Sequence, residues 1–145
     1  MKKMIFSLVL IGTLQLVNAQ EVGFRFGETL GLGVAIDGVF SVGEMSRVHA
    51  DLSFGNSGMA TEVLYDFINK PTKLEELNWY VGVGPSMFIG DEFVFGVCGE
   101  IGLEYRFEEV PIVLGIDWRP NFEILEDTSF DADEFGINIR YVFGK

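Results

Sequence analysis

Apolar and polar residues alternate along most of this chain after about residue 20. The clearest stretch is residues 93–107, where large apolar side chains hold the odd positions and small or charged ones the even positions. Alternation with a period of two is typical of a β-strand whose two faces meet different surroundings. The same pattern recurs at residues 22–27, 32–40, 47–54, 59–67, 78–88, 112–121 and 135–143. It is less regular in 59–67 than in the other stretches.

These stretches predict eight strands if the chain turns at residues 28–31, and seven if 22–40 forms one bent strand. We favour eight, because bacterial membrane barrels use even numbers of strands. Helical periodicity is weak, and frequent Gly disfavours helices. Short segments rich in turn-forming residues separate the strands, while two connections are longer, at 69–77 and 122–134. No linker divides the chain after residue 20, so residues 20–145 are expected to form a single β-barrel domain.

Alternation alone fits two architectures. A soluble barrel buries its apolar row, whereas a membrane barrel turns that row to lipid and fills its lumen with the polar row. The polar rows here carry both signs of charge, and every basic residue on them is Arg, which pairs with carboxylates better than Lys does. Gly is interleaved on the same rows, as a narrow interior requires. The predicted lumen charge network comprises Arg25, Asp37, Arg47, Asp51, Glu62, Asp66, Glu100, Glu104, Arg106, Asp117, Arg119 and Arg140.

The positions of the aromatic residues also favour the membrane barrel. In an up-and-down meander that starts in the periplasm, a set of aromatics falls at the periplasmic end, as an interfacial girdle would. The set comprises Trp79, Tyr105, Phe107, Tyr141 and Phe143. The same topology places the 122–134 loop outside the cell, where such barrels have long loops. The 69–77 connection is then an unusually long periplasmic turn.

Residues 1–19 have the features of an export signal. Lys2 and Lys3 precede an apolar run over residues 4–17, and residues 17–19 (Val-Asn-Ala) form a small-residue cleavage site. The run is shorter than the roughly 20 residues that a membrane-spanning helix needs. A buried N-terminal helix is the alternative, and the order of the three regions favours the signal peptide.

Composition narrows the function classes. A net charge of -12 disfavours binding of nucleic acid. A single Cys cannot form an internal disulfide, and a single His and a single Cys form no His/Cys cluster for zinc or iron–sulfur binding. We therefore expect no cofactor. Cys98 is predicted to be a packed thiol.

Catalysis is considered because His49, Asp51 and Ser53 share one row of one strand. That row is predicted to face the lumen, so we favour a His bonded to a carboxylate over a catalytic His, and expect no enzyme activity. The carboxylates of the 122–134 loop do not have the spacing of an EF-hand, and are predicted to be solvated. They are Glu123, Glu126, Asp127, Asp131, Asp133 and Glu134.

Several segments, together with the export signal, resemble small outer-membrane β-barrel proteins of diderm bacteria, the OmpX/OmpA-like barrel-domain families. They are LNWYVGVG at 77–84, GLEYRF at 102–107, PI at 111–112, DWRP at 117–120 and IRYVF at 139–143. The resemblance implies an eight-stranded antiparallel transmembrane barrel in the outer membrane. It also implies outer-membrane lipid and the barrel-assembly machinery as partners.

Two functions remain open from the sequence. The first is a non-enzymatic, monomeric outer-membrane barrel with a plugged lumen and a structural or surface-interaction role. The second is a soluble periplasmic calycin-like barrel that binds a small apolar ligand inside.

Overall fold

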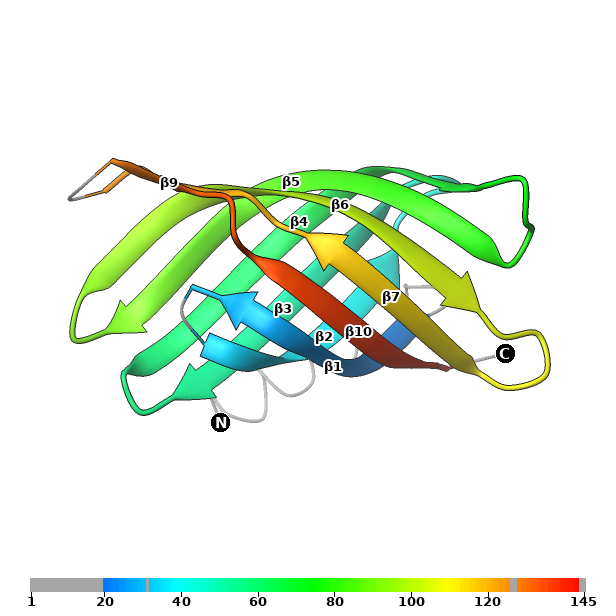
Figure 1. Ribbon diagram of the computed structural model, residues 1–145, viewed down its shortest axis with the longest axis horizontal. Coiled ribbons are helices and arrows are strands. Elements are labelled where there is room, and N and C mark those ends of the chain that lie inside the picture. Colours follow the sequence, from blue (N-terminus) through cyan, green and yellow to red (C-terminus); the bar gives the residue numbers. More distant parts are fainter. Residues whose placement is uncertain (1–19, 31, 126–127, 144–145) are drawn as a thin grey trace, which may run out of the picture.

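The computed structural model describes residues 20–30, 32–125 and 128–143 (Figure 1). The described part consists of β-strands and turns, and it contains no helix long and apolar enough to span a membrane. The predicted signal peptide lies outside it. The strands are β1 (Gln20–Thr29), β2 (Leu32–Ser41), β3 (Arg47–Gly55), β4 (Gly58–Pro71), β5 (Leu77–Gly90), β6 (Phe93–Arg106), β7 (Ile112–Trp118), β8 (Asn121–Glu123), β9 (Ser129–Asp131) and β10 (Phe135–Val142).

Eight of these strands close into an antiparallel barrel. From β1 to β7, each strand pairs with the next one along the chain. Strand β7 then pairs with β10, and β10 pairs with β1, which completes the ring. The predictions of an all-β fold and of eight strands are confirmed, and the chain turns between Thr29 and Leu32 as expected. Strands β8 and β9 are a short hairpin that continues from one end of the barrel, where β8 pairs with β6.

The predicted long connection at 69–77 is wrong. Strand β4 continues to Pro71, where Lys70 pairs with Trp79 and Pro71 with Asn78, so only residues 72–76 form the turn. The register between β4 and β5 shifts between Asp66 and Ile68. Such a bulge gives one strand an extra residue, which interrupts strict alternation. Within 59–67, before the bulge, burial alternates strictly, and the pattern looked less regular because the apolar Ala60 and Leu64 share the buried row with Glu62 and Asp66.

The 122–134 segment is also more ordered than a simple loop. Strand β7 ends at Trp118 rather than running to Asn121, and Pro120 cannot donate a backbone hydrogen bond to a ladder. Beyond this break the chain forms the β8–β9 hairpin, which projects past the barrel wall (Figure 1). Two hydrogen bonds fix the return of the chain: Trp118 Nε1 donates to Ala132 O at 2.7 Å, and Arg119 N donates to Glu134 O at 2.8 Å.

Along each barrel strand, the side chains alternate between buried positions that face the interior and more exposed positions that face outward. In β10, Asn138 and Arg140 are buried, whereas Ile137 and Ile139 are exposed. Strand β3 buries His49 and Asp51 in the same way. Apolar side chains thus cover the outside of the barrel, while the inside holds polar side chains and a small number of apolar or aromatic ones. The latter are Ala35, Val39, Ala60, Leu64, Tyr80, Cys98, Val113 and Val142.

The aromatic residues singled out in the sequence lie at one end of the barrel. Register places Tyr105 opposite Leu77 and Leu114, and Tyr141 opposite Ile112, all next to the turns at 72–76 and 107–111. The rings of Tyr105 and Phe107, and those of Tyr141 and Phe143, meet edge to face with centroids 5.0 and 4.9 Å apart. The β8–β9 hairpin is at the opposite end (Figure 1).

Candidate functional site

Most of the buried charged side chains form one connected set of ion pairs inside the barrel. Every residue of the predicted charge network belongs to it, and all are buried except Arg106, whose side chain is 33% exposed. Because a buried charge is costly unless it is paired, the network accounts for how so many charged groups fit inside the sheet.

Glu104 is the centre of the network at the aromatic end. Arg47 Nη1 donates to both carboxylate oxygens at 2.9 Å, Arg140 Nη2 donates at 2.5 Å, and Arg106 Nη2 at 3.2 Å. Arg140 also donates to Glu21 at 2.9 Å and to Asp37 at 3.0 Å. Its guanidinium group therefore joins β10 to β1, β2 and β6.

Arg47 is held on three sides. Its Nε donates to Asp66 Oδ2 at 2.6 Å, and its guanidinium carbon lies 4.4 Å from the centre of the Tyr80 ring. Such a cation–π contact is strengthened when both groups are withdrawn from water, as they are here. The Tyr80 ring also meets the His49 ring in a T-shaped arrangement, with ring centroids 6.1 Å apart.

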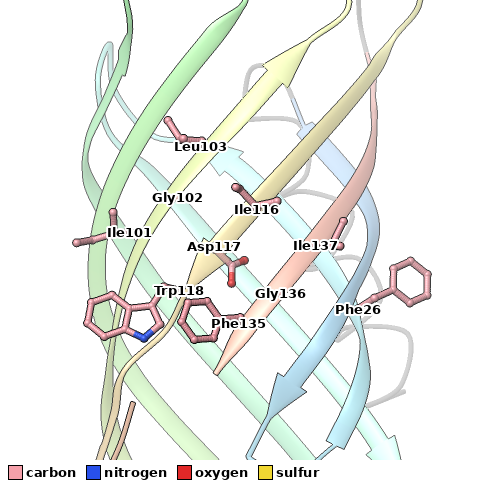
Figure 2. Close-up of a pocket in the computed structure, with 10 residues that line it drawn as sticks. All are labelled: Phe26, Ile101, Gly102, Leu103, Ile116, Asp117, Trp118, Phe135, Gly136 and Ile137. Atoms are coloured by element: carbon pink, nitrogen blue, oxygen red, sulfur yellow. The ribbon is translucent and has the colours of Figure 1, made fainter. Parts of the chain in front are cut away.

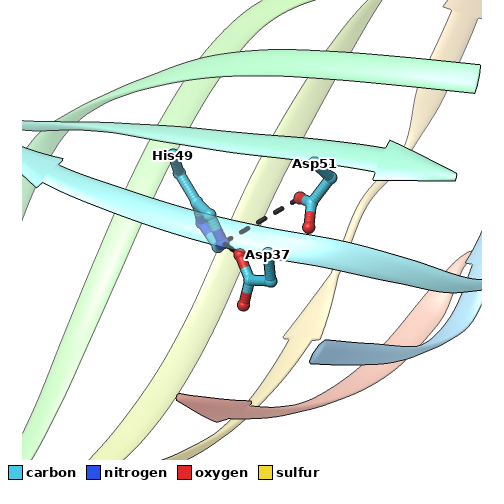
Figure 3. A group of neighbouring side chains, drawn as sticks. All are labelled: Asp37, His49 and Asp51. Atoms are coloured by element: carbon cyan, nitrogen blue, oxygen red, sulfur yellow. Dashed lines mark hydrogen bonds and ion pairs between the residues drawn. The ribbon is translucent and has the colours of Figure 1, made fainter. Parts of the chain in front are cut away.

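His49 lies near the middle of the interior, between two carboxylates. Its Nε2 is 2.5 Å from Asp37 Oδ1 and 3.9 Å from Asp51 Oδ2 (Figure 3). Its Nδ1 is 2.9 Å from Glu100 Oε1. Because a carboxylate oxygen faces each ring nitrogen, this arrangement suits an imidazole in which both nitrogens carry a hydrogen and donate it. The predicted pairing of His49 with a carboxylate is present in this structure.

No nucleophile–base pair forms at His49. Ser53 Oγ donates to Val34 O at 2.5 Å, and both ring nitrogens of His49 are occupied by carboxylates. A general base needs a free nitrogen within hydrogen-bond reach of the nucleophile. This row of β3 therefore belongs to the ion-pair network.

Arg119 binds several carboxylates in the part of the interior nearer the β8–β9 hairpin. It donates to Glu62 at 2.7 Å, to Glu100 at 3.1 Å and to Asp51. Arg119 follows the end of β7, and the break at Pro120 turns the chain there so that Arg119 stays inside. Next to it, Arg25 Nη2 pairs with Asp117 Oδ1 at 2.7 Å, and Asn138 Nδ2 donates to Asp117 Oδ2 at 2.9 Å.

Two buried members of the network were not in the predicted set. Glu21 pairs with Arg106 and Arg140, and Asn138 pairs with Asp117. The predicted first strand began at residue 22, although continuing its polar row backward from Arg25 through Gly23 leads to Glu21. Asn138 was on the predicted polar row but was not counted because it carries no charge.

The acidic loop separates into exposed and buried carboxylates. Asp131 and Asp133 are exposed, and Glu123 accepts a hydrogen bond from Ser129 Oγ at 2.9 Å. Glu134 is only 1% exposed, so the expectation that it is solvated is wrong. Burial, and then the nearby charge of Glu62, raise the pKa of Glu134 to about 8. Glu126 and Asp127 lie outside the described residues.

The outer wall carries an apolar groove of about 550 Å³ across β6, β7, β10 and β1. Outward-facing Ile116, Ile137 and Leu103 line its length, and Figure 2 shows Trp118 beside Phe135 at one end of it. The rings of Trp118 and Phe135 are stacked, with centroids 6.5 Å apart. The groove is on the exposed apolar face and is separate from the ion pairs inside.

Comparison with known proteins identifies no relative: no protein-family model matches the chain, and no curated protein matches it. The assignment of a function therefore depends on the geometry.

We predict that Glu104→Leu lowers the free energy of unfolding by about 3–5 kcal/mol, because it leaves Arg47 and Arg140 buried without their shared carboxylate. Equilibrium urea unfolding of the refolded protein in detergent measures the change. The matched control is Glu109→Leu in the exposed 107–111 turn, which should change stability by less than about 0.5 kcal/mol. Equal stabilities for the two variants would contradict the prediction.

Proposed function

We propose that this protein is a non-enzymatic outer-membrane β-barrel of a diderm bacterium, with a lumen plugged by ion pairs and a structural or surface-interaction role. The observation that carries the proposal is an apolar outer wall around an interior filled with paired charges. This is the inverse of a soluble protein, and it is the distribution that a barrel in lipid requires.

The outer wall is apolar on strands around the ring. Phe24 of β1, Ile36 of β2, Tyr65 of β4, Val83 of β5 and Ile116 of β7 are each about half exposed. Soluble monomers rarely expose contiguous apolar patches larger than a few hundred Å². A wall of this kind on every side is explained by contact with acyl chains.

The two ends of the barrel support an orientation in which the aromatic end faces the periplasm and the hairpin end faces the cell exterior. The aromatic end has five-residue turns at 42–46, 72–76 and 107–111, whereas the opposite end has tighter turns at 56–57 and 91–92 together with the one long connection, which follows β7. It is this long connection, rather than the length of the other turns, that supports placing the opposite end outside the cell. The opposite end carries the β8–β9 hairpin, whose Phe130 is 64% exposed. An exposed hairpin beyond the wall favours contact with another molecule at the cell surface. The predicted export signal and the segments that resemble OmpX/OmpA-like barrels agree with this proposal.

The soluble calycin-like alternative is less well supported. It needs an apolar cavity inside the barrel, whereas the interior is occupied by ion pairs, and the apolar groove at Ile116 and Trp118 opens on the outer wall. An interior of eight strands is just wide enough for side chains to fill. The same argument favours a plugged lumen over a water-filled pore.

Cell fractionation with heat-dependent gel migration tests the location. We expect the protein in the outer-membrane pellet, and we expect unboiled samples to migrate differently from boiled ones, because a closed barrel resists detergent until heated. Recovery in the soluble periplasmic fraction would overturn the proposal and favour the calycin-like alternative.

Substitution on the outer wall tests the contact with lipid directly. Ile36 lies in the middle of β2 and points outward. Ile36→Arg should destabilise the protein folded in lipid vesicles by about 2–4 kcal/mol, because a charge at the bilayer midplane is costly. The control Ile36→Leu keeps the apolar surface. A wall in water would tolerate both changes within about 0.5 kcal/mol, and that result would contradict the proposal.

Planar bilayer recording tests the plug. The purified protein should show no steady single-channel conductance, because Arg47, Arg119 and Arg140 and their carboxylates occupy the interior. Steady channels of uniform size would show that water and ions pass through the barrel.

A further inference from the structure

Three possible metal ligands from separate parts of the chain meet inside the barrel. Glu62 of β4, Cys98 of β6 and Glu134, just before β10, each offer a ligand atom, and these atoms lie within 4.8 Å of one another. The three residues are 0%, 0% and 1% exposed. Glu134 reaches this position because Arg119 N holds its carbonyl oxygen and Leu30 N donates to its Oε1 at 3.2 Å.

The cluster contains polar atoms with no partner. Glu62 Oε2 accepts from Arg119 Nη1 at 2.7 Å, but Glu62 Oε1 has no hydrogen-bond partner. Glu134 Oε2 has none either, and no Lys, Arg or His of the described ranges forms an ion pair with Glu134. Buried carboxylate oxygens in native proteins are nearly always satisfied, so two orphans side by side indicate a missing partner.

The local charge favours a cation as that partner. Arg119 is the nearest guanidinium, and it is already shared among Glu62, Glu100 and Asp51. The described interior also buries more carboxylates than guanidinium groups. A positive charge between Glu62 and Glu134 would therefore reduce an excess of negative charge rather than oppose Arg119.

The donor set selects the kind of cation. Calcium and magnesium prefer oxygen ligands alone, whereas zinc accepts a Cys sulfur together with carboxylate oxygens. With Zn–S near 2.3 Å and Zn–O near 2.1 Å, ligand atoms of a tetrahedral site lie about 3.5 Å apart. Binding of zinc therefore requires the ligand atoms of Glu62, Cys98 and Glu134 to draw together from their present separations of up to 4.8 Å, and requires a water molecule as the fourth ligand.

We propose that Glu62, Cys98 and Glu134 bind a zinc ion or a similar borderline-soft divalent cation. The ion ties the end of the acidic 122–134 segment to the barrel wall, and so fixes where the β8–β9 hairpin leaves the barrel. The sequence offered no His/Cys cluster for zinc, and this mixed site exists only because the fold brings β4, β6 and the returning loop together.

A proton is the competing occupant. A neutral Glu134 carboxyl group donating to Glu62 Oε1 would satisfy both orphan oxygens without a metal, and Cys98 would then be a packed thiol. The two occupants differ in whether the Cys98 sulfur is a ligand, so the experiment follows the sulfur.

The test is titration of the chelator-treated, refolded protein with Co²⁺, a spectroscopic substitute for zinc. We expect one equivalent to bind with a sulfur-to-cobalt charge-transfer band in the near ultraviolet, and Zn²⁺ to abolish the band by displacement. Cys98→Ser should remove the band. Glu134→Gln should weaken Zn²⁺ binding by about tenfold or more, as the loss of a direct ligand exceeds the effect known for outer-shell groups.

The matched control is Glu123→Gln, in the same acidic loop but outside the cluster, which should bind as the unchanged protein does. Heat-dependent gel migration of each variant verifies that the barrel is folded, whichever compartment it occupies. Absence of the sulfur band in the folded, unchanged protein would overturn the proposal and favour the shared proton. Equal loss of binding in Glu123→Gln would instead place the metal on the exposed loop, and would also overturn it.

Discussion

The pairing of buried charges inside a closed sheet is the constraint on which the rest of this structure depends. Closing eight strands leaves an interior that side chains fill, so each charge there must find its partner on another strand. Arg140 illustrates the solution, since one planar guanidinium group reaches Glu21, Asp37 and Glu104 on three strands. Arginine suits this role because it presents several donors in fixed directions.

The same constraint explains how the barrel and its projecting hairpin are joined. The break at Pro120 ends β7, keeps Arg119 among the interior carboxylates and starts the β8–β9 hairpin. The chain then returns through Glu134, which is inserted into the interior without a guanidinium partner. The position of the hairpin is thus coupled to the charge balance inside the wall, and a cation at Glu62, Cys98 and Glu134 would act on both.

The inner and outer surfaces of the barrel have different proposed roles. Inside, His49 contacts Asp37 and Glu100 and so links β3 to β2 and β6. Outside, the wall and its groove near Trp118 are apolar, and we propose that this surface contacts lipid. The hairpin end carries the exposed Phe130 and exposed carboxylates such as Asp131, and we propose it as the surface for recognition in water.

Local pattern determined the strands and which residues share a face, because alternation of side chains is intrinsic to an extended backbone. It therefore also identified Arg25, Glu104 and most of the interior charges before any contact was known. Tertiary structure alone decided the bulge after Asp66, the extension of β4 to Pro71 and the burial of Glu134. These depend on the register between strands and on closure of the ring, which bring together residues far apart in the sequence, and no local pattern encodes that distance.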